Sequence, residues 1–121
     1  MPKILLAEDD TTMLTLLQTL LRMEGFETAA LGETENVLDA IIREKPDAVL
    51  LDVHLTQGNG IEFLREIRLS PQLDQMLILM QSGLDLSEEC LAAGADVFLL
   101  KPYMPDRLLA AIHQGLAKHQ G

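Results

Sequence analysis

The sequence predicts an α/β fold: a doubly wound parallel sheet of five strands with five helices on its two faces. Short apolar runs of strand length alternate five times with segments whose apolar residues recur at helical spacing. Two of the runs, 4–7 and 48–51, are apolar throughout, as expected of strands buried on both faces. Right-handed crossovers between parallel strands would place helices on both sides of such a sheet.

The first half of the chain contains three predicted strands and two predicted helices. The strands are 3–7, 26–30 and 47–51, and the helices are 11–24 and 35–44. Asp10 is a typical N-cap for the first helix, and Gly25 stands where a helix-ending glycine belongs. Pro46 restricts the residue before it to extended backbone and so ends the second helix.

The second half repeats the pattern after a predicted loop at 53–59. The strands are 76–81 and 97–100, and the helices are 60–68, a short segment ending at Gly94, and 105–118. The short helix is expected to open with a capping box formed by Asp85 and Glu88. Pro105 in the first turn favours the start of the last helix.

Composition limits the classes of function. A chain of 121 residues, 48% of them hydrophobic, predicts one compact domain spanning 1–121. The formal charge of −10 argues against nucleic acid or an anionic membrane as a direct partner, because both bind basic surfaces. The single cysteine, Cys90, favours a reducing compartment, and no segment resembles a signal peptide or a membrane span. We therefore expect a cytoplasmic protein.

Acidic residues follow two of the predicted strands. Glu8, Asp9 and Asp10 come directly after the first strand, and Asp52 follows the third. The carboxyl ends of parallel strands meet at one edge of a sheet, so these side chains should converge there. Two carboxylates about 4 Å apart repel by roughly 4 kcal/mol at an effective dielectric constant of about 20. Such a cluster needs a cation, and carboxylate oxygens predict a Mg²⁺-type site.

Four motifs together resemble the receiver domain of bacterial response regulators. They are Glu8-Asp9-Asp10 after the first strand, Asp52 after the third, Ser82-Gly83 after the fourth and Lys101-Pro102 after the fifth. Their joint order and spacing carry the resemblance, which covers about residues 2–118. It implies a flavodoxin-like strand order of 2-1-3-4-5 and a place in two-component signalling, with a sensor histidine kinase or phosphotransfer protein upstream and an unknown protein or effector domain downstream.

The resemblance also implies a role for each motif. Asp52 would accept a phosphoryl group from a phosphohistidine. The implied Mg²⁺ ligands are Glu8 through water, Asp9, Asp52 and the backbone carbonyl of His54. The implied phosphoryl contacts are Ser82, Gly83 and Lys101, and Lys101-Pro102 is expected to be a cis peptide. Phe98 occupies the position of the switch aromatic, but it lacks the hydroxyl of the more usual tyrosine. Such a domain would not be an enzyme in the ordinary sense, since it catalyses only its own phosphoryl transfer and dephosphorylation.

The chain departs from the family pattern in two places that concern the loops around the site. The interval from Ser82 to Gly94 is about three residues shorter than usual, which shortens the fourth helix and affects a surface that most receivers use for output or dimerisation. Thr56 stands where the family often has proline, which should loosen the loop after Asp52.

Three other classes of function share some of these features. A phosphohydrolase of the haloacid dehalogenase type would need an acid where His54 stands, and the chain is too short for that fold. A carrier of flavin mononucleotide would need a phosphate-binding loop after the first strand, where this chain has repelling acids. A receiver-like module that acts by protein contact without phosphorylation remains the alternative.

Overall fold

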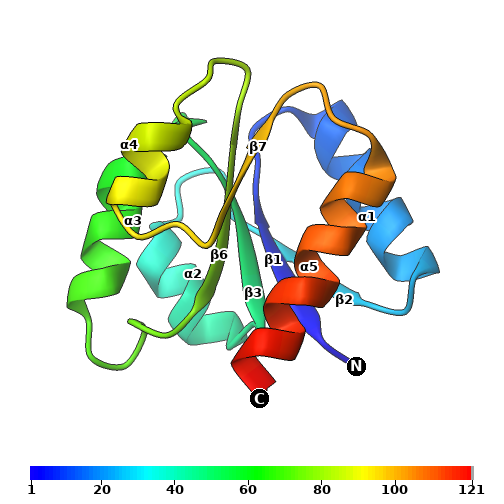
Figure 1. The fold of residues 1–121 in the computed structure, drawn as a ribbon, viewed down its shortest axis with the longest axis horizontal. Helices are drawn as coiled ribbons and strands as arrows, with labels where there is room; N and C mark the ends of the chain where they lie inside the picture. Colours follow the sequence, from blue (N-terminus) through cyan, green and yellow to red (C-terminus); the bar gives the residue numbers. More distant parts are fainter. Residues whose placement is uncertain (121) are drawn as a thin grey trace.

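The computed structural model describes residues 1–120 and contains the predicted parallel sheet with helices on both faces (Figure 1). The strand order is β2-β1-β3-β6-β7, which is the order 2-1-3-4-5 once a separate two-stranded hairpin is left out of the count. The strands of the sheet are β1 (Lys3–Ala7), β2 (Glu27–Ala30), β3 (Ala48–Asp52), β6 (Leu77–Ser82) and β7 (Val97–Leu100). The helices are α1 (Thr11–Met23), α2 (Val37–Glu44), α3 (Gly60–Leu69), α4 (Ser87–Ala92) and α5 (Pro105–Gln120). None of the helices in residues 1–120 is long and apolar enough to span a membrane.

The core is divided into two clusters by the sheet. Alternate residues of β3 and β6 point to opposite faces, so Val49 and Ile78 pack toward α2, α3 and α4, whereas Leu50 and Leu79 pack toward α1 and α5. Every residue of β3 and β6 is buried, as expected of the central strands of a sheet covered on both sides. The carboxyl ends of β3 and β6 are therefore held in fixed positions relative to each other.

The predicted loop after β3 contains a short antiparallel hairpin. It consists of β4 (His54–Leu55) and β5 (Gly58–Asn59), with His54 opposite Asn59 and Leu55 opposite Gly58. Gly58 has φ +150°, a value that side chains rarely allow, so glycine makes this turn accessible. Gly60 then begins α3 against the backbone of β3, where an added Cβ would lie 2.3 Å from the Asp52 carbonyl oxygen.

The predicted capping box of α4 is wrong. Asp85 Oδ1 accepts hydrogen bonds from the backbone N–H and the hydroxyl of Ser87, at 3.2 and 2.6 Å. The side chain of Asp85 is thus used inside the turn, and α4 begins at Ser87 after Leu86 with no side-chain cap. The helix α2 also begins later than predicted, because Asn36 caps it through the N–H groups of Leu38 and Asp39.

At the amino end of the sheet, the guanidinium of Arg68 joins three segments. It donates to the carbonyl oxygens of Gly94, Asp74 and Met76 at 2.7–3.0 Å and to the carboxylate of Asp96 at 3.1 Å. These acceptors precede β6 and β7, so one side chain of α3 fixes the entry of both strands. The arginine has an acceptor for each of its donor nitrogens, as a partly buried cation requires.

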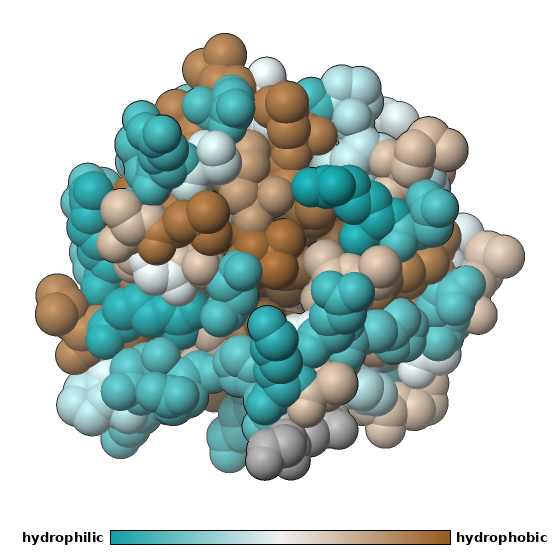
Figure 2. All heavy atoms as spheres, in the orientation of Figure 1, coloured by the Kyte–Doolittle hydropathy of each residue, from teal (hydrophilic) through white to brown (hydrophobic). Residues whose placement is uncertain are grey.

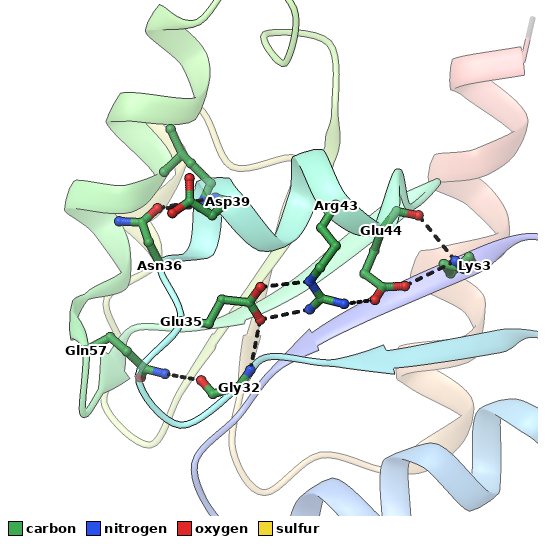
Figure 3. Close-up of polar contacts among 9 residues, drawn as sticks. Lys3, Gly32, Glu35, Asn36, Asp39, Arg43, Glu44 and Gln57 are labelled. Atoms are coloured by element: carbon green, nitrogen blue, oxygen red, sulfur yellow. Dashed lines mark hydrogen bonds and ion pairs between the residues drawn. The ribbon is translucent and has the colours of Figure 1, made fainter.

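A second ionic network ties α2 to the start of β1 (Figure 3). Glu35 accepts two hydrogen bonds from Arg43 at 2.8 Å and one from the N–H of Gly32. Arg43 also pairs with Glu44, which in turn pairs with Lys3 at 3.2 Å. The hydrogen bonds from Arg43 lower the pKa of Glu35, so the network favours the ionised carboxylate.

Candidate functional site

Asp52 ends the central strand β3 and is 4% exposed. One carboxylate oxygen, Oδ1, accepts a hydrogen bond from the backbone N–H of His54 at 2.9 Å. The other, Oδ2, accepts from the ammonium of Lys101. A buried carboxylate is costly unless its oxygens have donors, and here each oxygen has one.

Lys101 follows β7 and connects the two acidic segments. Its Nζ donates to Glu8 Oε1 at 2.8 Å as well as to Asp52, and both carboxylate side chains are almost fully buried. Burial disfavours the ammonium, but the hydrogen bonds to Asp52 and Glu8 outweigh it, and the pKa of Lys101 lies above its ordinary value. The Lys101–Pro102 peptide bond is cis, as predicted.

Asp9 faces the hairpin loop. Its Oδ2 accepts hydrogen bonds from the backbone N–H and the hydroxyl of Thr56, at 2.5 and 2.9 Å. Asp10 caps α1 by accepting from the N–H groups of Thr12 and Met13, which is the helix-capping role predicted for it. The three acids after β1 therefore have three different environments, and only Glu8 shares a donor with Asp52.

The residues present fit a hard cation by the chemistry of their donors. Glu8 and Asp52 direct carboxylate oxygens to the same ammonium, that of Lys101, which offsets only part of their charge. Within residues 1–120, no group of three carboxylate, histidine or cysteine side chains has the closeness of a preformed metal site. The reason is visible in Asp9, whose carboxylate is directed to Thr56. The side chain of His54 is exposed, which leaves its carbonyl as the predicted ligand.

The predicted phosphoryl contacts lie at the ends of neighbouring strands. Ser82 is the last residue of β6, is fully buried, and accepts a hydrogen bond from the N–H of Leu84 at 3.1 Å. A Cβ added to Gly83 would meet no heavy atom within 4 Å, so the space beside its backbone is open. Phe98 lies on β7 and packs against the cluster on the α2–α4 face.

Two polar residues that the sequence reading missed extend the site toward α5. Gln81, fully buried on β6, donates from Nε2 to Glu8 Oε1 at 3.2 Å and accepts from the hydroxyl of Tyr103 at 2.5 Å. Burial raises the pKa of Tyr103, and the charges of Glu8 and Asp52 raise it further, so its hydroxyl stays a neutral donor. An amide at the end of the apolar run 77–80 was the signal available in the sequence.

The chain belongs to the response regulator receiver domain family, whose sequence model matches residues 4–113. Solved structures agree. A receiver domain protein from Methanospirillum hungatei superposes with a TM-score of 0.89 at 29% identity, covering 99% of this chain and 97% of that one. The receiver domain of sensor histidine kinase PA1611 from Pseudomonas aeruginosa, which has a magnesium ion coordinated in its active-site cleft, gives 0.84 at 26% identity, with coverage of 96% and 98%. The predicted resemblance and fold are confirmed.

Curated relatives are longer proteins. The DNA-binding response regulator MtrA of Mycolicibacterium smegmatis is 32% identical over 120 residues, which cover 98% of this chain and 52% of that protein. The transcriptional regulatory protein CpxR of Klebsiella pneumoniae is 38% identical over 113 residues, or 93% of this chain and 48% of that one. The chain thus spans about half the length of the curated relatives it matches.

The expectation of no direct nucleic-acid partner is contradicted by the curated relatives. MtrA is a DNA-binding response regulator and CpxR a transcriptional regulatory protein. The charge of −10 describes only the surface of the sequence given, and it carries no information about the remaining half of such relatives. A receiver can be acidic while the regulator that contains it binds DNA.

Proposed function

We propose that residues 1–121 form one receiver domain of a two-component response regulator in which Asp52 accepts a phosphoryl group from the phosphohistidine of a sensor histidine kinase or phosphotransfer protein. The observation that carries the proposal is the pairing of buried Asp52 with Lys101 beside Glu8, at the carboxyl edge of the sheet. Ligands of open α/β sheets bind at this edge. The cytoplasm is the proposed location, as expected for a partner of the kinase.

In the proposed reaction, a carboxylate oxygen of Asp52 attacks phosphorus in line with the phosphorus–nitrogen bond of the phosphohistidine. That bond breaks, the electron pair leaves with the imidazole, and Asp52 becomes an acyl phosphate. Glu8, Asp9, Asp52 and the carbonyl of His54 would hold Mg²⁺, which supplies positive charge to the oxygens of the transferred group when it is bound. Lys101 adds a second positive charge.

The product needs new donors, because the phosphoryl group carries more negative charge than the carboxylate it replaces. We assign this task to Lys101, the hydroxyl of Ser82 and the N–H of Gly83. Within residues 1–120, the hydroxyl of Ser82 accepts from the N–H of Leu84 and donates to no other group, so its proton is free to be donated to a phosphoryl oxygen. Movement of Ser82 would then be coupled to repacking of Phe98.

The proposed output surface is the face formed by α4, β7 and α5. Apolar side chains are gathered on this face between α4 and α5 (Figure 2). The large hydrophobic residues exposed on this part of the chain are Leu84, Leu91, Leu100 and Met104. By analogy with MtrA and CpxR, we propose that the signal passes from this surface to a nucleic-acid-binding domain or partner.

The proposal is tested by measuring intact mass after incubation with acetyl phosphate, with and without Mg²⁺. The expected result is a Mg²⁺-dependent gain of one phosphoryl group that is absent in Asp52→Asn. The gain should decay after the donor is removed if the domain also catalyses its own dephosphorylation. Phosphorylation of Asp52→Asn at the wild-type level would overturn the assignment. An unmodified wild type that also fails to bind beryllofluoride with Mg²⁺ would favour the module that acts by contact alone.

A further inference from the structure

The buried amide of Gln81 is not explained by the packing around it. The four preceding residues of β6 are apolar and buried, and Leu79, on the same face of the strand, belongs to the cluster under α1 and α5. An apolar side chain at position 81 would continue that cluster. A buried amide without partners costs several kcal/mol, so the residue is tolerated here only through its hydrogen bonds.

Both ends of the amide have partners of the required type. An ionised carboxylate only accepts, so the NH₂ group of Gln81 must face Glu8, at 3.2 Å between Nε2 and Oε1. The carbonyl oxygen of Gln81 then faces Tyr103, whose hydroxyl must donate. The direction of each hydrogen bond in the chain Tyr103 to Gln81 to Glu8 is therefore fixed by chemistry.

Glu8 is held from three sides. Its Oε1 accepts from Gln81 on β6 and from Lys101 after β7, and its Oε2 accepts from the backbone N–H of Asp10 at 3.2 Å. Lys101 is also bonded to Asp52 and would have to engage a phosphoryl group there. Gln81 is a neutral donor to Glu8 and, unlike Lys101, does not also donate to Asp52. It can therefore fix the orientation of Glu8 independently of Lys101.

We propose that Gln81 and Tyr103 are positioning residues that orient Glu8 for Mg²⁺ binding and so tune the phosphorylation of Asp52. This inference rests on the proposed function. Partners that orient a metal-binding carboxylate typically change metal affinity by about 10- to 100-fold when they are removed. Tyr103 also lines an apolar groove of about 200 Å³ between α1 and α5, so the pair connects the site to the face opposite Phe98.

The test compares Gln81→Met and Tyr103→Phe with Leu79→Met, a matched buried substitution on the same strand and face. Calorimetric titration with Mg²⁺ should give a Kd about tenfold weaker for Gln81→Met and about threefold weaker for Tyr103→Phe. The double variant should be no weaker than Gln81→Met alone, because both residues act through Glu8. Leu79→Met should keep the wild-type Kd.

Two readouts separate positioning from a purely structural role. With acetyl phosphate, Gln81→Met should be slow at limiting Mg²⁺ and should recover most of its rate at saturating Mg²⁺. Tyr103 is the only tyrosine and the chain has no tryptophan, so intrinsic fluorescence reports on this residue alone. Its emission should change with Mg²⁺ in the wild type and in Leu79→Met, and should not change in Gln81→Met.

A wild-type Mg²⁺ Kd in both Gln81→Met and Tyr103→Phe overturns the inference, even if thermal stability falls. If Gln81→Met does not fold, Tyr103→Phe still tests the inference. A wild-type Kd in Tyr103→Phe, with an unaltered rate at limiting Mg²⁺, is then sufficient to overturn the inference. A wild type that does not bind Mg²⁺ overturns it together with the metal site. A wild type whose Mg²⁺ affinity depends on Gln81 but which gains no phosphoryl group supports the inference and contradicts the proposed function.

Discussion

At the carboxyl end of the sheet, two buried carboxylates share the ammonium of Lys101, whereas at the amino end the guanidinium of Arg68 has three carbonyl oxygens and the carboxylate of Asp96 as acceptors. Both groups are charged, and their carboxylates differ in burial: those of Glu8 and Asp52 are almost fully buried, whereas that of Asp96 is about one-third exposed. The group around Lys101 has two carboxylates for one ammonium, so it carries excess negative charge. The group around Arg68 has one carboxylate for one guanidinium, and each carbonyl oxygen in it accepts a hydrogen bond. A cluster with uncompensated charge is suited to binding a cation or a phosphoryl group, while a balanced one is suited to stability.

Lys101→Ala should produce the largest effect at the carboxyl end. Removing one preorganised charge from a site of phosphoryl transfer should slow phosphorylation by about 10²- to 10³-fold, as measured by intact mass over time with acetyl phosphate and Mg²⁺. Because Glu8 and Asp52 would then repel without an ammonium, saturating Mg²⁺ should raise the Tm of Lys101→Ala by more than it raises that of the wild type.

The control for this substitution is Lys118→Ala, which removes an exposed lysine near the end of α5. It should leave both the rate and the Mg²⁺-dependent change in Tm as in the wild type. Equal rates in Lys101→Ala and Lys118→Ala would show that the charge of Lys101 takes no part in the transfer.

Arg68→Ala should have the opposite profile. It removes the guanidinium that donates to three carbonyl oxygens and to Asp96, which keeps the backbone N–H of Ile78, so the free energy of unfolding should fall by about 2–3 kcal/mol, as measured by urea denaturation. Phosphorylation should stay at the wild-type rate. Arg65→Ala is the matched control on the same helix, because Arg65 is exposed and Glu62 is its one ion-pair partner in the part of the chain that the structure describes. This substitution should cost about 0.5 kcal/mol or less. A larger loss for Arg65→Ala than for Arg68→Ala would contradict the comparison.

Gly60→Ala should disturb stability and chemistry together. Its Cβ would lie 2.3 Å from the carbonyl oxygen of Asp52 and 2.9 Å from the Cα of Val53, both of which are backbone atoms. The forced shift should cost about 1–3 kcal/mol and should slow phosphorylation by displacing Asp52, as measured by denaturation and by intact mass. Gly83→Ala, with open space at its Cβ, should change stability by about 1 kcal/mol or less. Equal losses in the two variants would mean that the backbone contact is not the cause.

The smallest expected effect is a loss of folding stability at alkaline pH, caused by ionisation of Tyr103. Burial, with the charges of Glu8 and Asp52, raises the pKa of Tyr103 above the value of about 10 in an unfolded chain. The neutral phenol is therefore favoured in the fold, and its contribution to stability is complete below about pH 10 and is lost as pH rises toward the higher folded pKa. Tyrosinate absorbance should increase together with the loss of circular dichroism. An increase near pH 10 with the fold intact would contradict this.

The strands could be predicted from local pattern, and the meeting of Glu8, Asp52 and Lys101 from sheet topology, whereas the strand order was predicted from the resemblance to receiver domains. Parallel strands bring their carboxyl ends to one edge whatever the loops do. The start of α4 was predicted wrongly because the carboxylate of Asp85 is bonded to Ser87 within the turn. The hairpin at 54–59 was missed because each of its strands has only two residues.

The orientation of individual side chains could not be predicted from the sequence pattern. The carboxylate of Asp9 is directed to Thr56, 47 positions along the chain. Nothing in the local sequence directs this carboxylate to Thr56 rather than toward the site around Asp52. The contact from Gln81 to Glu8 likewise joins residues 73 positions apart. Such contacts depend on the final packing of several elements, and a pattern along one strand fixes only the face to which a residue points.

The burial of β3 has a consequence for how the molecule opens. Backbone amides exchange with solvent through local openings, which are cheapest at edges with few buried contacts. The edge strand β2 has no fully buried residue, while all five residues of β3 are buried between β1 and β6. Amides of 28–30 should therefore exchange through sub-global openings, and those of 49–52 only when the whole domain unfolds. Asp52 is thus carried by the last segment of the sheet to come apart, and fluctuations at the edge leave its position unchanged.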